Sequence, residues 1–262
     1  MSQSKPLGFR KLGCRECRNG EGLGFEFSMA FQPIVNTQTG EVYAHEALVR
    51  GPEGQGAGWV FQQVNAHNMY RFDQSCRVKA ISLAASLGLP GYLSINFMPN
   101  AVYRPELCIR TTLEAAEQFG FAIERIIFEF TESEKIQDFE HLKNIIQHYQ
   151  ATGFTTAIDD FGAGFSGLNL LANLQTDALK IDMQLIRHID ADPVRRAIVR
   201  SIVQCCRELS IRVIAEGIES AAEWRCLQDM GIELHQGYFF ARPAFEAIPD
   251  VQYPQNPPTA AG

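Results

Sequence analysis

The sequence predicts an α/β protein folded as a closed (β/α)8 barrel of the TIM type, and three observations lead to this expectation. Apolar, strand-like runs alternate with helical stretches from about residue 25 onward, as in a parallel sheet whose strands are joined by helices. About eight such units fit the length of the chain, which suits a closed barrel better than an open sheet. Carboxylates fall at the C-terminal ends of the strands, where barrels of this kind carry their functional groups.

The strands are placed by short apolar runs bounded by turn residues. The first two, 27–35 and 41–50, follow one another across a turn at Thr39 and Gly40. The remaining strands are expected at 92–97, 125–131, 155–161, 177–182, 212–218 and 234–237.

Helical stretches fill the intervals between the later strands. They are expected at 60–87, 105–119, 139–150, 168–174, 193–209 and 221–230. Residues 1–24 are rich in glycine, arginine and polar residues without a clear period, and we interpret them as an appendage. The barrel then spans 25–248, and the proline-rich segment 249–262 is expected to be extended or disordered. No second domain is expected.

Composition narrows the class of protein. The chain has 262 residues, of which 46% are hydrophobic, so it can build a full core. Its net charge of -7 argues against a DNA-binding protein, although an anionic ligand remains possible where metal ions and a few basic side chains meet its charge. No apolar run approaches the roughly 18 residues of a membrane span, and the N-terminus lacks a signal-peptide pattern. Seven cysteines do not suggest a disulfide framework, so we expect a cytoplasmic protein without a membrane partner.

Several apolar runs end in carboxylates, and one ends in two adjacent ones. These residues are Glu46, Glu129 with Glu132, Asp159 with Asp160, Asp182, and Glu216 with Glu219. Clustered carboxylates repel one another and lose hydration, so a folded protein gathers this many only around a cation. Asn96 adds an amide oxygen, and no histidine or cysteine lies close, which favours Mg²⁺ or Mn²⁺ over structural zinc. Two such ions about 3.5–4 Å apart form a clamp for phosphate-ester hydrolysis.

The paired aspartates and two basic residues extend this interpretation. Asp159 and Asp160 end a strand that opens into a glycine-rich turn, so both can face the mouth, and one of them can bridge two ions. Lys180 is expected on the face of its strand that reaches the same mouth, where its ammonium can steady a nucleophilic water or developing phosphorane charge. The guanidinium group of Arg50 is a candidate for bidentate hydrogen bonding to a phosphate.

Each of these residues also has an ordinary structural interpretation. A lone acid after a strand is often a helix N-cap, and Asp182 and Glu219 could be only that. Lys180 could be a solvated loop lysine, Asn96 a turn residue and Arg50 half of a surface ion pair. If each acid were only a helix N-cap, however, the two adjacent aspartates and the further acids on neighbouring strands would have no common explanation.

Ordered motifs between Phe31 and Pro243 carry a family resemblance. They are FQPIV, EALVR, the strand of Asn96, FEFTES, DDFGAGFSGL, LKID, AEGIE and QGYFFARP. In this order they resemble the EAL domains, which are bacterial cyclic-di-GMP phosphodiesterases. The resemblance implies a barrel with an antiparallel first strand. It also implies Mg²⁺- or Mn²⁺-dependent hydrolysis of cyclic-di-GMP to linear pGpG, which lowers the level of this second messenger.

The resemblance also implies roles for individual residues. One metal would be held by Glu46, Asn96, Glu129 and Asp159. The other would be held by Asp159, Asp160 and Glu216. The catalytic set would be Lys180, which contacts the attacking water, together with Glu46 and Glu216. Residues bordering the substrate would be Gln32, Leu48, Arg50, Asp182, Glu219 and Gln236. Glu132 would pin the loop after Asp160, which the family uses to couple the metal site to a dimer contact, so a homodimer is expected.

Departures from the family pattern are modest. Gly51 and Pro52 follow Arg50 where an aromatic or basic residue is common, and Ala163 replaces a frequent threonine. None of the implied metal ligands is missing. Two rival interpretations stay open: a cyclic-di-GMP receptor or interaction module without turnover, and a different barrel metalloenzyme.

Remaining cysteines and one histidine are assigned no part in this chemistry. Cys14 and Cys17 form half of a zinc site, which leaves a metal or redox role open beside that of incidental thiols. Cysteines in the helical stretches are expected to pack in the interior; these are Cys205, Cys206 and Cys226. His235 is expected to be structural.

Overall fold

The computed structural model describes residues 23–102, 104–131, 138–164 and 167–253. The residues with Cys14 and Cys17, the loop residue Glu132 and most of the proline-rich segment lie outside this part of the chain.

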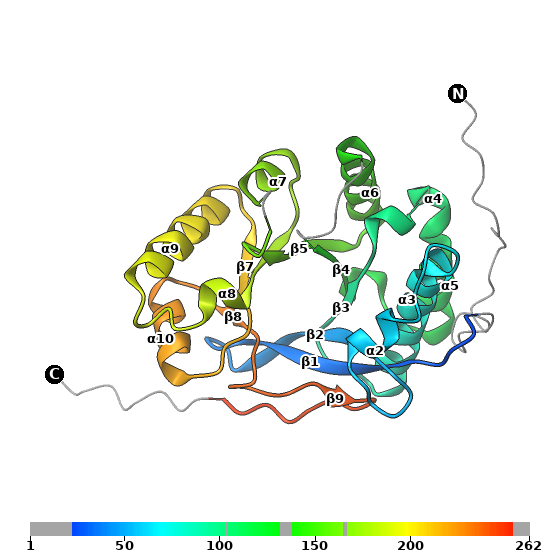
Figure 1. The fold of residues 1–262 in the computed structure, drawn as a ribbon, viewed down its shortest axis with the longest axis horizontal. Coiled ribbons are helices and arrows are strands. Elements are labelled where there is room, and N and C mark those ends of the chain that lie inside the picture. Colours follow the sequence, from blue (N-terminus) through cyan, green and yellow to red (C-terminus); the bar gives the residue numbers. More distant parts are fainter. Residues whose placement is uncertain (1–22, 103, 132–137, 165–166, 254–262) are drawn as a thin grey trace.

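The strands close into one barrel (Figure 1), which confirms the predicted fold class. Around the barrel they run β2 (Glu41–Arg50), β3 (Tyr92–Asn96), β4 (Ile126–Thr131), β5 (Thr155–Phe161), β6 (Ala178–Ile181), β7 (Arg212–Ala215), β8 (Leu234–His235) and β1 (Ser28–Asn36). Neighbours from β2 to β8 are parallel. The first strand is antiparallel to both β2 and β8, as the family resemblance implied, and its pairing with β2 closes the ring.

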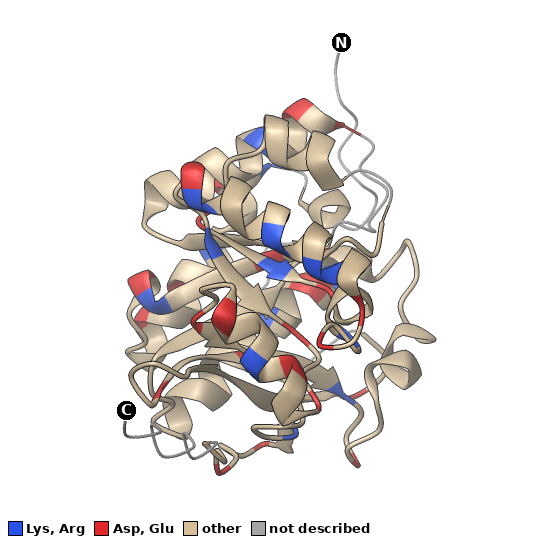
Figure 2. Ribbon diagram, turned by 90° about the vertical axis from the view of Figure 1, so that its left-hand side faces the viewer, with Lys and Arg blue, Asp and Glu red and all other residues tan. Residues whose placement is uncertain are grey.

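Longer helices pack outside the strands and shorter turns of helix join them (Figure 1). The longer ones are α3 (Met69–Ser86), α5 (Arg110–Phe119), α6 (Phe139–Thr152), α7 (Gly167–Asn173), α9 (Pro193–Glu208) and α10 (Ala221–Asp229). Short elements are α2 (Ala57–Phe61), η1 (Pro99–Ala101), α4 (Pro105–Cys108), η2 (Ile123–Arg125) and α8 (Met183–Ile186). A two-residue strand, β9 (Ala244–Phe245), pairs with β1. On the side seen in Figure 2, basic and acidic residues are interspersed along the ribbon rather than gathered into a basic stripe.

Helix boundaries follow local capping chemistry. The side chain of Asp138 caps α6 by accepting from the backbone N–H of His141, and Asp192 caps α9 just before a proline. Ser220 and Glu223 form a reciprocal capping box at the start of α10.

One predicted helix is wrong in its extent. The expected stretch 60–87 is divided into α2 and α3, because residues between them form a hydrogen-bonded turn. There the backbone N–H of Asn65 donates to Oδ1 of Asn68, and Asn65 in turn accepts from His67. Short polar side chains that bond the backbone in this way compete with helix formation. The stretch 105–119 is similarly divided into α4 and α5, and neither α8 nor β9 was predicted.

Strand alternation builds the barrel interior in two layers. The lower layer is an apolar cluster of Ile34, Ala44, Ile127, Ala157, Ala178, Ile214 and Leu234. In the parallel strands, the residue two positions further along points to the same side, since strand side chains repeat with a period of two. Those residues are Glu46, Glu129, Asp159, Lys180, Glu216 and Gln236. The polar groups therefore form a second layer directly above an apolar floor, at the C-terminal mouth.

Candidate metal centre

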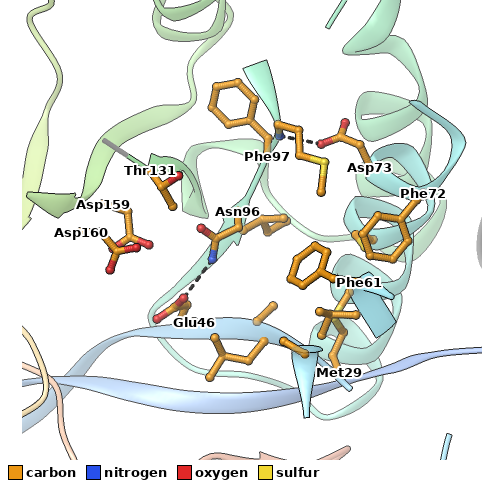
Figure 3. Close-up of a pocket in the computed structure, with 17 residues that line it drawn as sticks. Met29, Glu46, Phe61, Phe72, Asp73, Asn96, Phe97, Thr131, Asp159 and Asp160 are labelled. Carbon is orange, nitrogen blue, oxygen red and sulfur yellow. Dashed lines mark hydrogen bonds between the residues drawn. The ribbon is translucent and has the colours of Figure 1, made fainter. Parts of the chain in front are cut away.

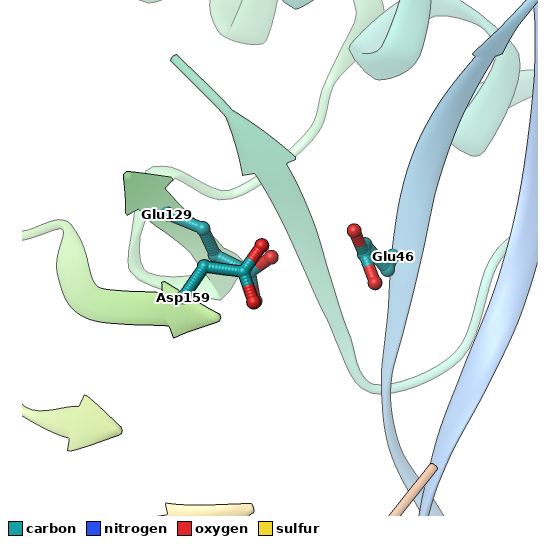
Figure 4. Close-up of side chains that lie close together, drawn as sticks. All are labelled: Glu46, Glu129 and Asp159. Carbon is teal, nitrogen blue, oxygen red and sulfur yellow. The ribbon is translucent and has the colours of Figure 1, made fainter. Parts of the chain in front are cut away.

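Carboxylates from separate strands meet at the mouth of the barrel. Figure 4 shows Glu46, Glu129 and Asp159 reaching inward from β2, β4 and β5, and their oxygen atoms lie within 4.8 Å of one another. A second group, made of Asp159, Asp160 and Glu216, meets the same limit of 4.8 Å. Asp159 belongs to both groups, so two carboxylate sets lie side by side and share one residue.

The adjacent aspartates share one face because the strand is irregular at its end. The register between β5 and β6 shifts between Ile158 and Phe161. Asp160 lies in the left-handed region with φ 53°, a conformation that aspartate tolerates better than most residues. In a regular strand Asp160 would point away from Asp159. The distortion brings it to the same mouth.

Lys180 lies at the centre of these carboxylates and is fully buried. Its Nζ is 2.7 Å from Glu216 Oε1 and 3.0 Å from both Glu129 Oε2 and Asp159 Oδ1. Glu46 Oε2 lies 3.2 Å from the same nitrogen. The alternative of a solvated loop lysine is therefore wrong.

One ammonium group does not balance so many carboxylates, and their pKa values reflect this. Burial, and then the neighbouring acids, raise the pKa of Glu129 to about 8 even though Lys180 acts in the opposite direction. Burial likewise raises the pKa of Asp159 and, well above its usual range, that of Glu216. Burial and the charge of Asp159 raise the pKa of Asp160 to about 6. The mouth thus carries excess negative charge that a cation would relieve.

Glu46 is the exception among these acids. Burial acts to raise its pKa, but the charge of Lys180 and three hydrogen bonds outweigh burial and lower it. Nε2 of Gln236 donates to Glu46 Oε2 at 2.7 Å, and Nδ2 of Asn96 donates to Oε1 at 2.9 Å (Figure 3). Glu46 is therefore held as an ionised carboxylate.

The donor set fits hard divalent cations. Oε1 of Glu129 is buried and has no hydrogen-bond partner among the described residues. A carboxylate oxygen left without a donor in a buried position is costly unless a ligand completes it. Carboxylates in both groups supply oxygen alone, as Mg²⁺ and Mn²⁺ prefer.

Several other residues that were expected to border the substrate have contacts of their own with the protein. Gln32 contacts Gln236 and donates to the carbonyl of Ala241. Asp182 accepts from the backbone N–H of Gln184 and so caps α8, as the N-cap interpretation allowed. The guanidinium of Arg50 donates to the carbonyl of Val49. Leu48 lines the cavities described next.

Two cavities flank the carboxylates and share the lining residues Glu46, Leu48, Asp159 and Asp160. The first, of about 560 Å³, extends toward α2 and α3 and is walled by Phe61, Phe72 and other apolar side chains (Figure 3). The second, of about 360 Å³, extends toward the loops after β6, β7 and β8. It is lined by Asp182, Met183, Arg187, Glu216, Glu219 and Tyr238, among others.

Several lining residues were not predicted from the sequence. Arg187 and Tyr238 line the second cavity, and Phe61 and Phe72 line the first. Tyr238 lies within the quoted motif QGYFFARP, which is the signal that could have identified it. Arg187 lies outside every motif, so its position depends on the short helix α8, which the sequence did not predict.

His235 is buried, and the three cysteines expected in the helical stretches pack in or against the core. Nδ1 of His235 lies within hydrogen-bonding distance of Thr37 Oγ1 and the carbonyl of Glu233, and burial lowers its pKa to about 4. Cys206 is buried, whereas Cys205 and Cys226 are partly exposed, and all three are free thiols.

Comparison with known proteins points to one family. The family model described as EAL domain matches residues 20–243. Among curated relatives, the blue light- and temperature-regulated antirepressor BluF of Escherichia coli K12 is 34% identical over 87% of this chain and 57% of its own length. The probable cyclic di-GMP phosphodiesterase PdeG of the same organism is 28% identical over 87% of this chain and 46% of its own. The chain thus spans roughly half the length of these relatives.

Solved structures agree. A standalone versatile EAL protein from Vibrio cholerae O395, determined with cyclic-di-GMP bound, has 56% identity and a TM-score of 0.85, over 87% of this chain and 97% of that one. Klebsiella pneumoniae BlrP1, solved with cyclic-di-GMP and either calcium or manganese, has 36% identity and a TM-score of 0.82, over 87% of this chain and 58% of that one. Within the described residues, no helix has the length and apolar character needed for a membrane span.

Proposed function

This chain belongs to the EAL domain family, and from that premise we propose that it is a divalent-cation-dependent phosphodiesterase that hydrolyses cyclic-di-GMP to linear 5′-pGpG. Named phosphodiesterases among its relatives and the bound ligand in similar structures support this substrate. The observation that carries the proposal is the pair of carboxylate groups that share Asp159 at the barrel mouth.

Residues at the mouth divide into two sites for Mg²⁺ or Mn²⁺. Glu46, Glu129 and Asp159 would hold one ion together with the amide oxygen of Asn96. Asp159, Asp160 and Glu216 would hold the other. When bound, the two cations supply Lewis-acid polarisation of the phosphodiester and acidification of the attacking water. The shared position of Asp159 is what a two-ion clamp requires.

Lys180 orients the acids and supplies positive charge. Burial alone would lower its pKa, but the surrounding carboxylates raise that pKa well above its usual value, so the group stays an ammonium. Its contacts with Glu46 and Glu216 hold these two side chains at the mouth. An ammonium held there in advance can stabilise charge that develops on a phosphate without reorganising.

The shape of the mouth suits a ligand with two bases. The cavities lie on either side of the carboxylates and share Asp159 and Asp160. A cyclic dinucleotide has a central ring of two phosphodiesters with one base on each side. One phosphodiester can lie over the carboxylates while each base enters a cavity, with Gln32, Leu48 and Gln236 bordering the ring.

A second candidate function is binding without turnover. The relative BluF is named as an antirepressor, so an EAL domain can belong to a protein whose named role is to act on a partner. Full retention of the carboxylates favours the enzyme, because a binding module has no need for both groups. Assembly as a homodimer remains a prediction that light scattering on the purified chain would test.

Chromatography of reaction products tests the proposal. Purified protein with cyclic-di-GMP and Mn²⁺ is expected to yield pGpG, and a chelator is expected to stop the reaction. Binding of cyclic-di-GMP without any product at saturating Mn²⁺ would instead support the receptor. If the protein neither bound cyclic-di-GMP nor formed product, cyclic-di-GMP would not be its ligand and the proposed function would be wrong.

A further inference from the structure

Another cavity lies at the opposite end of the barrel from the carboxylates, and we call it the basal cavity. It has a volume of about 370 Å³ and is bordered by α9, the loop after α10 and the first residues of β7 and β8. These elements neighbour one another on one side of the barrel (Figure 1). Arg212 begins β7 and Glu216 follows its last residue, so about 13 Å of extended chain separates the basal cavity from the mouth. Leu234 of the apolar floor also lines the basal cavity, which is therefore separate from the metal centre.

Two arginines line the basal cavity without a carboxylate partner. Arg207 and Arg212 are both exposed, and neither forms an ion pair within the part of the chain that the structure describes. Nη1 of Arg207 donates to Oε1 of Gln204 at 3.3 Å, and Cζ of Arg212 lies 5.5 Å from the ring centroid of Tyr43. A guanidinium group carries five N–H donors in a planar fork. Both forks therefore keep donors for a ligand.

Tyr43 adds a hydroxyl group to the same cavity. Its oxygen is buried and has no hydrogen-bond partner among the described residues. The ring packs on Tyr92, with a centroid distance of 5.0 Å, and on the guanidinium of Arg212. Burial raises the pKa of Tyr43 to about 12 although Arg212 acts in the opposite direction, so the hydroxyl stays a neutral donor. A buried hydroxyl without a partner is costly unless a ligand or water completes it.

Nearby acids leave an excess of positive charge in the basal cavity. Glu233 is the one carboxylate among its described lining residues, and it pairs with neither arginine. The charge of Asp177 also acts on Tyr43, but Oδ2 of Asp177 already accepts from the backbone N–H and the hydroxyl of Thr156. The balance of charge is thus the reverse of that at the mouth, and an anion would relieve it.

The rest of the wall is apolar. The side chains that supply it are Val203, Ile211, Val213, Ile232 and Leu234. The volume falls within the range of small-molecule sites, roughly 300–1,000 Å³. Arginine forks match the oxygen atoms of a carboxylate or a phosphate, and the apolar wall matches a compact apolar body. We propose that the basal cavity binds a small organic anion, a carboxylate or a phosphate ester, through Arg207, Arg212 and the hydroxyl of Tyr43.

Three probes with the same phenyl body test this proposal. Phenyl phosphate and benzoate differ in their anionic group, and benzyl alcohol carries no charge. Each is titrated into the isotopically labelled full chain with Mg²⁺ present, and binding is followed by NMR. The amide of Gly231 reports on the basal cavity, and the amide of Gly217 reports on the mouth. At least one anion is expected to shift the Gly231 resonance and to bind about tenfold or more tightly than benzyl alcohol. The stronger of the two anions identifies the preferred anionic group.

Variants assign the binding to named side chains. Arg207→Ala and Arg212→Ala are each expected to weaken binding of the anion about tenfold to a hundredfold, because each removes charge-assisted hydrogen bonds. Arg212→Lys keeps the charge without the fork and should recover part of the loss. Tyr43→Phe removes the hydroxyl but keeps the ring, so it should weaken binding by about fivefold. Arg200→Ala, on the exposed face of α9, is the matched control and should change nothing.

Outcomes decide between an anion site and an apolar void. Loss of anion binding in Arg207→Ala and Arg212→Ala, with none in Arg200→Ala, supports the proposal. Benzyl alcohol binding as tightly as the anions, or arginine variants that bind the anions unchanged, overturns it. An anion that shifts Gly217 but leaves Gly231 unmoved also overturns it, because the anion then binds at the mouth. Thermal unfolding separates a loss of binding from a loss of fold, and the conservative variants Arg212→Lys and Tyr43→Phe keep the test available if an alanine variant unfolds.

Discussion

The barrel mouth and the contact between α3 and the barrel both bury charged side chains, but they balance the charge differently. At the mouth, one lysine faces four carboxylates. Beneath α3, Arg77 faces Asp73 alone, with Nη2 2.6 Å from Oδ2. The aromatic rings around Arg77 complete its surroundings, and their centroids lie 5.1 to 5.9 Å from its Cζ; these rings belong to Phe97, Phe128 and Tyr149.

Most polar atoms of the α3 pair contact protein groups, although Nε of Arg77 is buried without a hydrogen-bond partner among the described residues. Oδ1 of Asp73 accepts from the backbone N–H of Met98, and Nη1 of Arg77 donates to the hydroxyl of Tyr149. At the mouth, Oε1 of Glu129 is left without a donor among the described residues. Buried charge that is balanced within the protein serves the fold, whereas buried charge in excess marks a place where a ligand completes the structure.

The largest expected effect concerns the shared aspartate. Asp159→Asn removes one charge from both carboxylate groups, so we expect Mn²⁺-dependent hydrolysis of cyclic-di-GMP to fall by about a thousandfold or more. The fold should persist, because a raised pKa shows that the ionised group is unfavourable there. Asp192→Asn is the matched control, since asparagine also caps a helix. Near-normal hydrolysis by Asp159→Asn would contradict the assignment of Asp159 as the carboxylate shared by the two cations.

At α3, replacing an aspartate by asparagine should lower the stability of the fold rather than the rate of hydrolysis. Asp73→Asn leaves Arg77 buried without its counter-charge, and we expect the free energy of unfolding to drop by about 3–5 kcal/mol. Adding Arg77→Met to the same chain should restore much of this loss, because neither charge is then left unpaired. Denaturant unfolding measures both variants. A double variant no more stable than Asp73→Asn would show that the pair does more than balance charge.

The mouth should also make stability depend on pH and metal. In the metal-free chain, Glu129 and Asp160 hold protons up to about pH 8 and about pH 6, whereas unfolded carboxyls release theirs near 4.5 and 3.8. The folded state binds more protons in this window, so its stability falls as pH rises through it. Mn²⁺ competes with those protons and should raise the melting temperature more at about pH 8.5 than at about pH 6. An equal shift at both pH values would contradict this.

A smaller effect is expected for a carboxylate near the mouth that the backbone already satisfies. Oδ1 of Asp182 accepts from the N–H of Gln184 at 2.8 Å. Asp182→Ala should therefore lower the free energy of unfolding by about 1 kcal/mol, and Asp182→Ser, which keeps a cap, by much less. Equal losses in the two variants, measured by thermal unfolding, would show that the charge matters rather than the cap.

Much of this arrangement could be predicted from the sequence because it depends on a period of two within strands. Residue 46 follows residue 44, and residue 129 follows residue 127, on the same face, so the apolar floor places the acids above it. The doubled aspartate followed by a glycine-rich turn already indicated the distorted end of β5. The antiparallel first strand came from the family resemblance, not from periodicity.

The rest depended on packing that a strand pattern does not encode. The balance of Asp73 against Arg77 requires the position of α3 against the aromatic side chains of β4 and α6. Arg187 reaches the second cavity through α8, a helix too short to leave a periodic signal. The position of Lys180 on its strand face was predictable, but its simultaneous contact with four acids was not, because it requires the closed ring.

Counting bound Mn²⁺ tests the central claim most directly. Titration of the metal-free chain, followed by calorimetry or by metal analysis after dialysis, is expected to give about two Mn²⁺ per chain, with both sites severely weakened in Asp159→Asn. A chain that binds no Mn²⁺, or an Asp159→Asn variant that binds it with unchanged number and affinity, would contradict the claim that the excess carboxylates at the barrel mouth form a two-cation centre.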